Sequence, residues 1–265
     1  MSFVPASIAR RAALPVLLSL LVTPALAQPP RSHAADPVVQ GADAYARGDL
    51  KGAHEAYLAA LHEAPRSFTV LHRLARVEAE LAEDAPGEEA RQLTAAAIEH
   101  AREAIRIAPD SAAGHLELAA ALGRQALKEG PKTQLSLSRE IKSEVDRSLA
   151  IEPGRGRAWH VLAIWNRRLA SLNMVERAVA RTLLGGVPKG ASMDNAVADL
   201  QKAVELEPAY VNHRLELGRT LLQLGRRGDA RRELEKAVAL PPTSNPRDPH
   251  YQAQARVLLA KLGKG

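Results

Sequence analysis

The residues of this chain that could do chemistry include a glycine-rich turn, nine scattered histidines and one acidic run. The turn, from Gly185 to Gly190, reads GGVPKG and lies between two helical patterns. A glycine loop ahead of a helix can cradle a phosphate, but the P-loop motif needs G-x-x-x-x-G-K-[ST] after a strand. Here Ala191 and Ser192 follow Gly190, and no strand pattern precedes the turn. We therefore predict a structural corner and no phosphate site.

Metal and acid-base chemistry are equally poorly supported. None of the histidines forms the zinc motif H-E-x-x-H. His54 and His62 are separated by about 12 Å along a helix, too far to share one metal ion. The acidic run from Glu78 to Glu89 is typical of a solvated helix end and loop, because paired catalytic carboxylates need a cleft. We predict no catalytic residue, no metal site and no cofactor.

Composition favours an all-α fold. Of the 265 residues, 46% are hydrophobic and only 3% are aromatic, so small and aliphatic side chains must build the core. This balance favours many closely packed helices over a β-sandwich or barrel. The chain has no cysteine, which excludes disulfides and a lipidated thiol.

The N-terminus resembles a secretory signal. Arg10 and Arg11 precede an apolar run that ends in small residues at Ala25 and Ala27, as a signal-peptidase site requires. A membrane anchor is less well supported because the run is shorter than the ~20 residues that span a bilayer. A mitochondrial presequence is a third option, since no acid precedes Asp36, but such segments are amphipathic. We expect an exported protein, periplasmic or secreted, with no integral membrane segment after cleavage.

Removal of this signal leaves a mildly basic chain. Residues 1–27 contain two arginines and no acid, so the net charge falls from +6 to +4. That excess is too small to indicate nucleic-acid binding without a localised patch. We expect no nucleic-acid partner.

A repeat organises the remainder. Five prolines follow apolar helix ends, with gaps of 44, 44, 55 and 34 residues, and the last gap equals the tetratricopeptide period. These prolines are Pro65, Pro109, Pro153, Pro208 and Pro242. With Val211 as position 1, small residues occupy positions 8, 20 and 27 of the last unit: Gly218, Ala230 and Ala237. The first unit has Gly41, Ala53 and Ala60 at the same positions. Small residues there allow the two helices of a hairpin to approach closely.

The middle units are longer than this frame. Ten extra residues in units two and three predict longer helices, with turns near Asp84–Gly87 and at Gly130–Pro131. The surplus of 21 residues in unit four predicts an additional helix from Asn173 to Leu184. Asn173 and Glu176 form a plausible capping box for that helix.

The additional helix is predicted to pack through one apolar stripe, formed by Leu172, Val175, Val179 and Leu183. The whole chain is then an all-α tetratricopeptide solenoid of about five helix pairs, with an extra helix in the fourth unit and a C-terminal capping helix. We assign residues 1–27 to the signal peptide, 28–36 to a flexible linker and 37–265 to the repeat domain.

Residues 158–210 resemble the regulator of microtubule dynamics family, which shares the pattern "aWh.lgrw…lasl.w.er.va..lfG..P..s.eeAl..f.kA.eL.P". The matching residues are Trp159, His160, Trp165, Leu172, Glu176, Arg177, Gly185, Pro188, Ala196, Ala203 and Pro208. Two residues differ: Met174 replaces a common aromatic and Leu184 replaces a common Phe. The resemblance implies an α-helical solenoid without catalytic machinery. Eukaryotic family members associate with microtubules or organelle membranes, and some are linked to lipid binding.

Candidate binding residues follow from the repeat frame, because the first helices of a tetratricopeptide stack line its concave groove. Positions 2, 5, 9, 12 and 13 of these helices predict a groove of Tyr45, His72, Arg76, Arg124, Arg157, His160, Arg167, Arg168, Asn212 and Arg219. Six arginines there face one acid, Glu80. Such a surface suits carboxylates or phosphates, which arginine binds bidentately. Alternatively, an arginine-rich composition places arginines on any polar face.

These observations favour a non-catalytic interaction scaffold whose basic concave groove binds an acidic peptide or partner protein. The alternative is a carrier or sensor of an anionic lipid or small amphiphile. That alternative needs an apolar pocket beneath the arginines, between the extra helix and units four and five. An enzyme is the third and least supported class.

Overall fold

The computed structural model describes residues 36–263 except 185, 187–189, 242 and 244, together with residues 1–2. The side chains of Pro131, Leu183 and Leu184 are also not described. The predicted signal peptide therefore lies outside the described residues except for its first two, and so does the linker 28–36 except for Asp36. Of the predicted glycine corner, only Gly186 and Gly190 are described; both have positive φ, 116° and 90°, which favours glycine.

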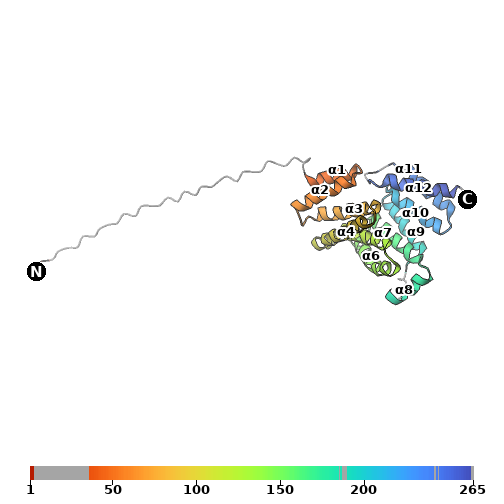
Figure 1. The fold of residues 1–265 in the computed structure, drawn as a ribbon, viewed down its shortest axis with the longest axis horizontal. Helices are drawn as coiled ribbons and strands as arrows, with labels where there is room; N and C mark the ends of the chain where they lie inside the picture. Colours follow the sequence, from red (N-terminus) through yellow and green to blue (C-terminus); the bar gives the residue numbers. More distant parts are fainter. Residues whose placement is uncertain (3–35, 185, 187–189, 242, 244, 264–265) are drawn as a thin grey trace. The chain divides into compact units, whose positions relative to one another are not determined.

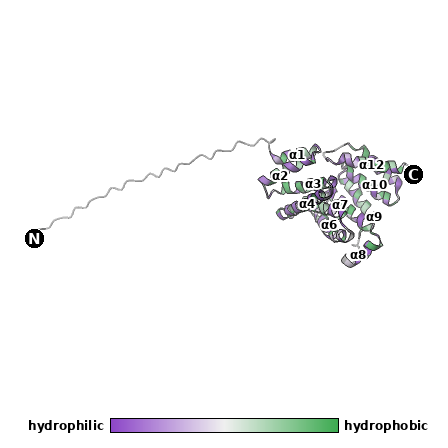
Figure 2. Ribbon diagram, in the orientation of Figure 1, coloured by the Kyte–Doolittle hydropathy of each residue, from purple (hydrophilic) through white to green (hydrophobic). Residues whose placement is uncertain are grey.

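The described part of the chain folds into twelve helices and contains no strand (Figure 1). In chain order these are α1 (Pro37–Ala46), α2 (Leu50–Glu63), α3 (Phe68–Asp84), α4 (Gly87–Ile107), α5 (Ala112–Lys128), α6 (Pro131–Ile151), α7 (Gly156–Ala170), α8 (Met174–Leu184), α9 (Met193–Leu206), α10 (Val211–Gln223), α11 (Arg227–Ala239) and α12 (Asp248–Leu262). The helices are amphipathic, with hydrophobic and hydrophilic residues interleaved along them (Figure 2).

Five antiparallel pairs make up the array, and the prediction of an all-α tetratricopeptide solenoid is confirmed. The pairs are α1/α2, α3/α4, α5/α6, α7/α9 and α10/α11; α8 packs on α6, and α12 packs on α10 and α11. First helices also contact the next first helix, α3 with α5 and α5 with α7. We call the surface formed by the first helices α1, α3, α5, α7 and α10 the inner face.

Four junctions between successive pairs share one geometry. Each contains four residues, between α2 and α3, α4 and α5, α6 and α7, and α9 and α10. The residue after each second helix has φ between −136° and −131° and ψ between 69° and 84°. In every case the next residue is one of the predicted prolines, Pro65, Pro109, Pro153 or Pro208. Because proline cannot continue a helix, the sequence fixes where each pair ends.

Longer helices account for the longer units, as predicted. In units two and three, α3 and α5 have 17 residues each and α4 and α6 have 21 each, against 13 each for α10 and α11. The turns fall where expected, since α3 ends at Asp84 and α6 begins at Pro131.

The capping box of α8 is present. The Glu176 amide donates to Asn173 Oδ1 at 2.9 Å, and the Asn173 amide donates to Glu176 Oε2 at 2.8 Å. The predicted apolar stripe is only partly correct, because Leu172 is buried while Val175 is 74% exposed. Glu176, which bonds to the Asn173 amide and to Arg168, and Ala180, four residues later, are the buried residues in the described part of this helix instead. Leu183, the last member of the predicted stripe, lies among the undescribed side chains.

Close approach within pairs depends on the predicted small residues. Ala53, Ala60, Ala230 and Ala237 are at most 3% exposed. A Cβ atom at Gly218 would lie 2.7 Å from Leu234 Cγ, and one at Gly41 would lie 2.5 Å from the Tyr57 ring. A larger residue at position 8 would therefore force α10 away from α11, or α1 away from α2.

Gly218→Ala should destabilise the protein by about 1–3 kcal/mol, the usual cost of overpacking a closed core. Gly123→Ala is the matched control, because it also lies within a helix but a Cβ there has no neighbour within 4 Å. That control should stabilise by about 0.5–1 kcal/mol through lower unfolded-state entropy. Urea unfolding of both variants checks the pair, and equal effects of the two substitutions would contradict the packing argument.

Candidate functional site: the inner face of the array

Several predicted groove residues meet at Glu80, which is 3% exposed on α3. Tyr45 on α1 donates its hydroxyl to Glu80 Oε1 at 2.9 Å, and Arg76 Nε donates to the same oxygen at 3.0 Å. The Arg76 guanidinium also lies 4.8 Å from the centre of the Tyr45 ring. Glu80 Oε2 is buried and has no hydrogen-bond partner among the described residues. One carboxylate thus organises this centre and keeps an unused acceptor.

Three tyrosines from distant parts of the chain surround this centre. Burial raises the pKa of Tyr45 above its ordinary value, and the charge of Glu80 raises it further. Burial likewise raises the pKa of Tyr210 and of Tyr251, and Glu80 adds to both shifts. Residues of α1, of the α9–α10 junction and of α12 therefore share one electrostatic environment.

Arg157 on α7 forms a two-pronged ion pair with Glu117 on α5. Its Nη1 and Nη2 donate to Glu117 Oε1 and Oε2 at 2.8 and 3.2 Å, and the two side chains are only 19% and 5% exposed. Burial raises the pKa of the Glu117 carboxyl, but Arg157 and Arg76 outweigh burial and leave this pKa below its ordinary value. This pair fastens α5 to α7 and leaves Arg157 no free terminal nitrogen.

Arg167 is held in the same manner by α10. Its Nη2 donates to Glu216 Oε2 at 2.5 Å, and its Nη1 donates to Thr220 Oγ1 at 3.0 Å. Arg219 also pairs with Glu216 and contacts Gln254. These arginines act as cross-links between neighbouring helices.

The remaining predicted residues are dispersed. Arg168 Nη2 donates to Glu176 Oε1 at 2.7 Å, and Arg168 also contacts Gln134 on α6, so it faces α6 and α8 rather than the Arg167 side. His72 contacts the Phe68 carbonyl oxygen through Nδ1 at 3.0 Å. Asn212 is half-buried on α10.

The expected excess of six arginines over one acid is wrong. Each of the six pairs with a carboxylate, and the acids that the sequence argument missed are Glu83, Glu117, Glu176 and Glu216. Glu117 and Glu216 both occupy position 6 of their units, immediately before Leu118 and Leu217. A glutamate recurring at that position was the available signal.

Two of the six arginines engage neither of their terminal nitrogens within the described residues. Arg76 and Arg124 each use Nε for their glutamate, and Arg124 donates it to Glu83 Oε1 at 2.9 Å. Within the described residues their Nη atoms have no hydrogen-bond partner. Their side chains are 28% and 24% exposed. The inner face therefore presents two partly shielded guanidinium groups that can accept an additional anion.

A histidine pair joins α7 to α10 beside this surface. His160 Nδ1 and His213 Nδ1 are 3.0 Å apart, so one must donate and the other accept. His213 Nε2 also lies 3.3 Å from Glu207 Oε2. Burial lowers the pKa of His160 well below 6.5, and the nearby His213 lowers it further; burial lowers the pKa of His213 in spite of Glu207. Both rings are therefore neutral in the folded protein at neutral pH.

Lowering the pH should reduce the free energy of unfolding, because the two buried histidines are neutral in the folded protein. A group with a depressed folded pKa gives its full stabilisation above the unfolded pKa, and this stabilisation is lost as the pH falls below about 6.5. The free energy of unfolding should fall less between pH 7.5 and pH 5.0 for His160→Gln than for wild type, because Gln can keep the bond to His213 without titrating.

The exposed His62→Gln variant is the control and should lose as much stability as wild type. His100 acts with the opposite sign: burial lowers its pKa, but the bond to Glu78 outweighs burial and leaves the pKa raised. The stabilisation from His100 is present below about pH 6.5 and is lost as the pH rises. All three proteins contain His100, so its effect is the same in each and does not change the comparison. An equal loss in wild type and His160→Gln would exclude the pair as the acid-sensitive element.

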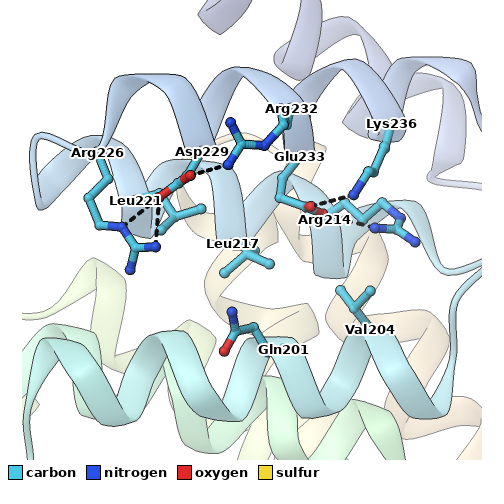
Figure 3. Close-up of a pocket in the computed structure, with 10 residues that line it drawn as sticks. All are labelled: Gln201, Val204, Arg214, Leu217, Leu221, Arg226, Asp229, Arg232, Glu233 and Lys236. Carbon is cyan, nitrogen blue, oxygen red and sulfur yellow. Dashed lines mark hydrogen bonds and ion pairs between the residues drawn. The ribbon is translucent and has the colours of Figure 1, made fainter.

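A hollow of about 330 Å³ lies between α9 and α11 over α10 (Figure 3). Asp229 pairs with Arg226 and Arg232, and Glu233 pairs with Arg214 and Lys236, along one side of it. Each carboxylate is shared by two cations, as Figure 3 shows. The hollow is thus bordered by ion pairs, and it is not the apolar pocket that the lipid alternative requires.

Over the described part of the chain, no cluster of three or more histidine, aspartate or glutamate side chains is arranged to hold a metal ion. A search of the same residues finds no helix with the length and apolar character needed to cross a bilayer.

The arrangement of paired helices, repeated junctions and inner-face side chains defines a tetratricopeptide-repeat protein. Solved structures agree: a thermophilic tetratricopeptide-repeat protein from Thermus thermophilus has a TM-score of 0.64 at 20% identity, covering 86% of this chain and 98% of that one. PilW, a type IV pilus biogenesis factor, has a TM-score of 0.51 at 19% identity, covering 88% and 94%. At these identities the likeness shows the fold alone.

The chain belongs to the regulator of microtubule dynamics protein 1-3 family, whose model matches residues 38–263. Regulator of microtubule dynamics protein 3 of Rattus norvegicus is 29% identical over 196 residues, covering 73% of this chain and 41% of the rat protein. Protein 1 of Caenorhabditis elegans is 26% identical, covering 72% and 84%. The chain thus spans less than half the length of the rat relative.

Proposed function

We propose that this protein is an interaction scaffold whose inner face binds an acidic peptide segment or the acidic terminus of a partner protein. The observation that supports this most directly is that the Nη atoms of Arg76 and Arg124 have no hydrogen-bond partner in the described part of the chain. An incoming carboxylate can bond to them without breaking any ion pair that holds the helices together. Charge-assisted bonds of this kind are about twice as strong as neutral ones.

This proposal narrows the set of binding residues. Arg157 and Arg167 already spend their terminal nitrogens on Glu117, Glu216 and Thr220, so their role is to hold helices together. Arg76 and Arg124 sit on consecutive first helices, α3 and α5, and Glu80 acts on both of their pKa values. A ligand with two carboxylates fits such a pair of guanidinium groups.

An anionic lipid or small amphiphile is the second candidate considered for the same arginines. It needs an apolar pocket for its tail beside these arginines. The hollow between α9 and α11 and a second hollow of about 510 Å³ near Ile98 and Leu122 both lack Arg76 and Arg124 in their linings. The acidic peptide is therefore favoured, and binding of lipid becomes an outcome of the experiment.

Arg76→Gln with Arg124→Gln should weaken binding of a fluorescein-labelled hexaglutamate peptide by at least tenfold. A hydrogen bond to a charged group contributes about 1.5–3 kcal/mol, and each of the two substitutions removes at least one such bond to the peptide. Fluorescence anisotropy at physiological ionic strength measures the affinity, with hexaglutamine as the neutral peptide.

Arg91→Gln with Arg102→Gln is the matched control, because it removes the same charge from exposed positions on α4. Thermal unfolding confirms that each variant is folded. Wild-type affinity in the Arg76/Arg124 variant would overturn the proposal. Binding to phosphatidylserine vesicles but not to hexaglutamate would favour the lipid candidate.

We propose an extracytoplasmic compartment because Arg10, Arg11 and the apolar run that ends at Ala27 resemble a cleavable secretory signal. The mature protein should then begin at Gln28. N-terminal sequencing of the native protein tests this, and a cytosolic protein that retains Met1 would refute export.

A further inference from the structure

A polar clasp joins two segments that are 163 residues apart in the sequence. Arg247, the residue before α12, donates Nη2 to Glu83 Oε2 at 2.7 Å and Nη1 to Asp84 at the end of α3. The Arg247 side chain is 4% exposed, whereas those of Glu83 and Asp84 are 29% and 62% exposed. The clasp therefore links the last unit of the array to the second.

The loop that carries Arg247 is built to place it. Thr243 donates its amide and hydroxyl to Asp248 Oδ2 at 2.8 and 2.7 Å, and the Arg247 amide donates to Asn245 Oδ1 at 3.0 Å. In the same loop, Pro246 Cβ lies 3.8 Å from the position that a Cβ would take at Gly48, between α1 and α2. The two ends of the array thus meet along this loop.

The clasp shares a carboxylate with the inner face. Glu83 Oε1 accepts from Arg124 Nε at 2.9 Å while Glu83 Oε2 accepts from Arg247. Among the six predicted groove arginines, Arg124 is one of the two whose Nη atoms have no partner within the described residues. Glu83 and Asp84, two consecutive acids, are therefore bound by arginines in the way that an acidic peptide would be.

Two further features make this contact exchangeable. Packing of α12 is mainly against α10 and α11, and among the described residues α12 has no comparable packing on α3 to reinforce the clasp. Arg247 Nε is buried and has no partner among the described residues, so the guanidinium is not fully satisfied by Glu83 and Asp84. A ligand that brings two carboxylates to Arg247 keeps this buried charge paired, so the exchange avoids the cost of leaving it uncompensated.

We propose that Glu83 and Asp84 act as an internal acidic ligand that keeps the array closed, and that an acidic partner with two adjacent carboxylates displaces them. Displacement of Glu83 and Asp84 from Arg247 frees that guanidinium, which then joins the Nη atoms of Arg76 and Arg124 in holding the partner. The identity of the ligand rests on the proposed function above.

Glu83→Gln with Asp84→Asn should raise the affinity for labelled hexaglutamate about fivefold or more, because the internal competitor is lost. The matched control is Glu88→Gln with Glu89→Gln, which removes two exposed acids at the start of α4 and leaves the clasp intact. The control measures the nonspecific effect of removing negative charge. A clasp with a purely structural role predicts the opposite result, an unchanged or weaker affinity.

A reversible cross-link tests the closure directly. The chain has no native cysteine, and the 3.8 Å spacing at Gly48 and Pro246 matches the usual Cβ–Cβ distance of a disulfide. Oxidised Gly48→Cys with Pro246→Cys should bind hexaglutamate at least fivefold more weakly than the same protein after reduction with dithiothreitol. Gly48→Ala with Pro246→Ala carries the same strain at the positive φ of Gly48 and should show no redox effect.

The outcomes separate the two proposals. If wild type binds the peptide and neither the clasp substitutions nor the cross-link changes the affinity, the internal-ligand inference is overturned and the proposed function stands. If wild type and the Glu83/Asp84 variant both fail to bind, the proposed function is wrong and the inference falls with it. A raised affinity in the Glu83/Asp84 variant together with redox-dependent binding supports both.

Discussion

Charge that helix stacking carries into the interior must be paired there, and the inner face of this protein is organised by that constraint. Arg157 and Glu117 show it most plainly, since neither can reach bulk water well enough to exist alone. Loss of one partner from a buried pair typically costs about 3–5 kcal/mol, because the other charge remains uncompensated. The pair therefore fixes the spacing of α5 and α7, and Arg167 with Glu216 does the same for α7 and α10.

The same constraint divides the arginines into two kinds. Arginines whose two terminal nitrogens are both bonded to a neighbouring helix fix the register of the array and have few donors left for a ligand. Those that engage only Nε, such as Arg76, remain chemically available while staying in place. A scaffold can thus be rigid and receptive with one residue type, because guanidinium has more donors than a single carboxylate uses.

Much of the fold was predictable because its determinants are local. Proline two residues past each second helix and small residues at positions 8, 20 and 27 can be read within one unit, and the capping box of α8 spans four residues. The charge balance of the site was not predictable in this way. Glu117 and Arg157 are 40 residues apart, and only the stacking of units brings them together. The Val175 error has a local origin: the apolar pattern alone does not show that Glu176, which bonds to the Asn173 amide and to Arg168, is buried in place of Val175.

All variation in length among the hairpins occurs at one edge of the array. The four-residue junctions are constant, whereas the opposite turns range from the two residues between α3 and α4 to the long segment that contains α8. New chain added at that edge lengthens or extends a unit, while the junction to the next unit keeps its four residues and its backbone geometry. The array can therefore acquire new surface by insertion, as it does with α8, which packs back on α6 and buries Ala180 there.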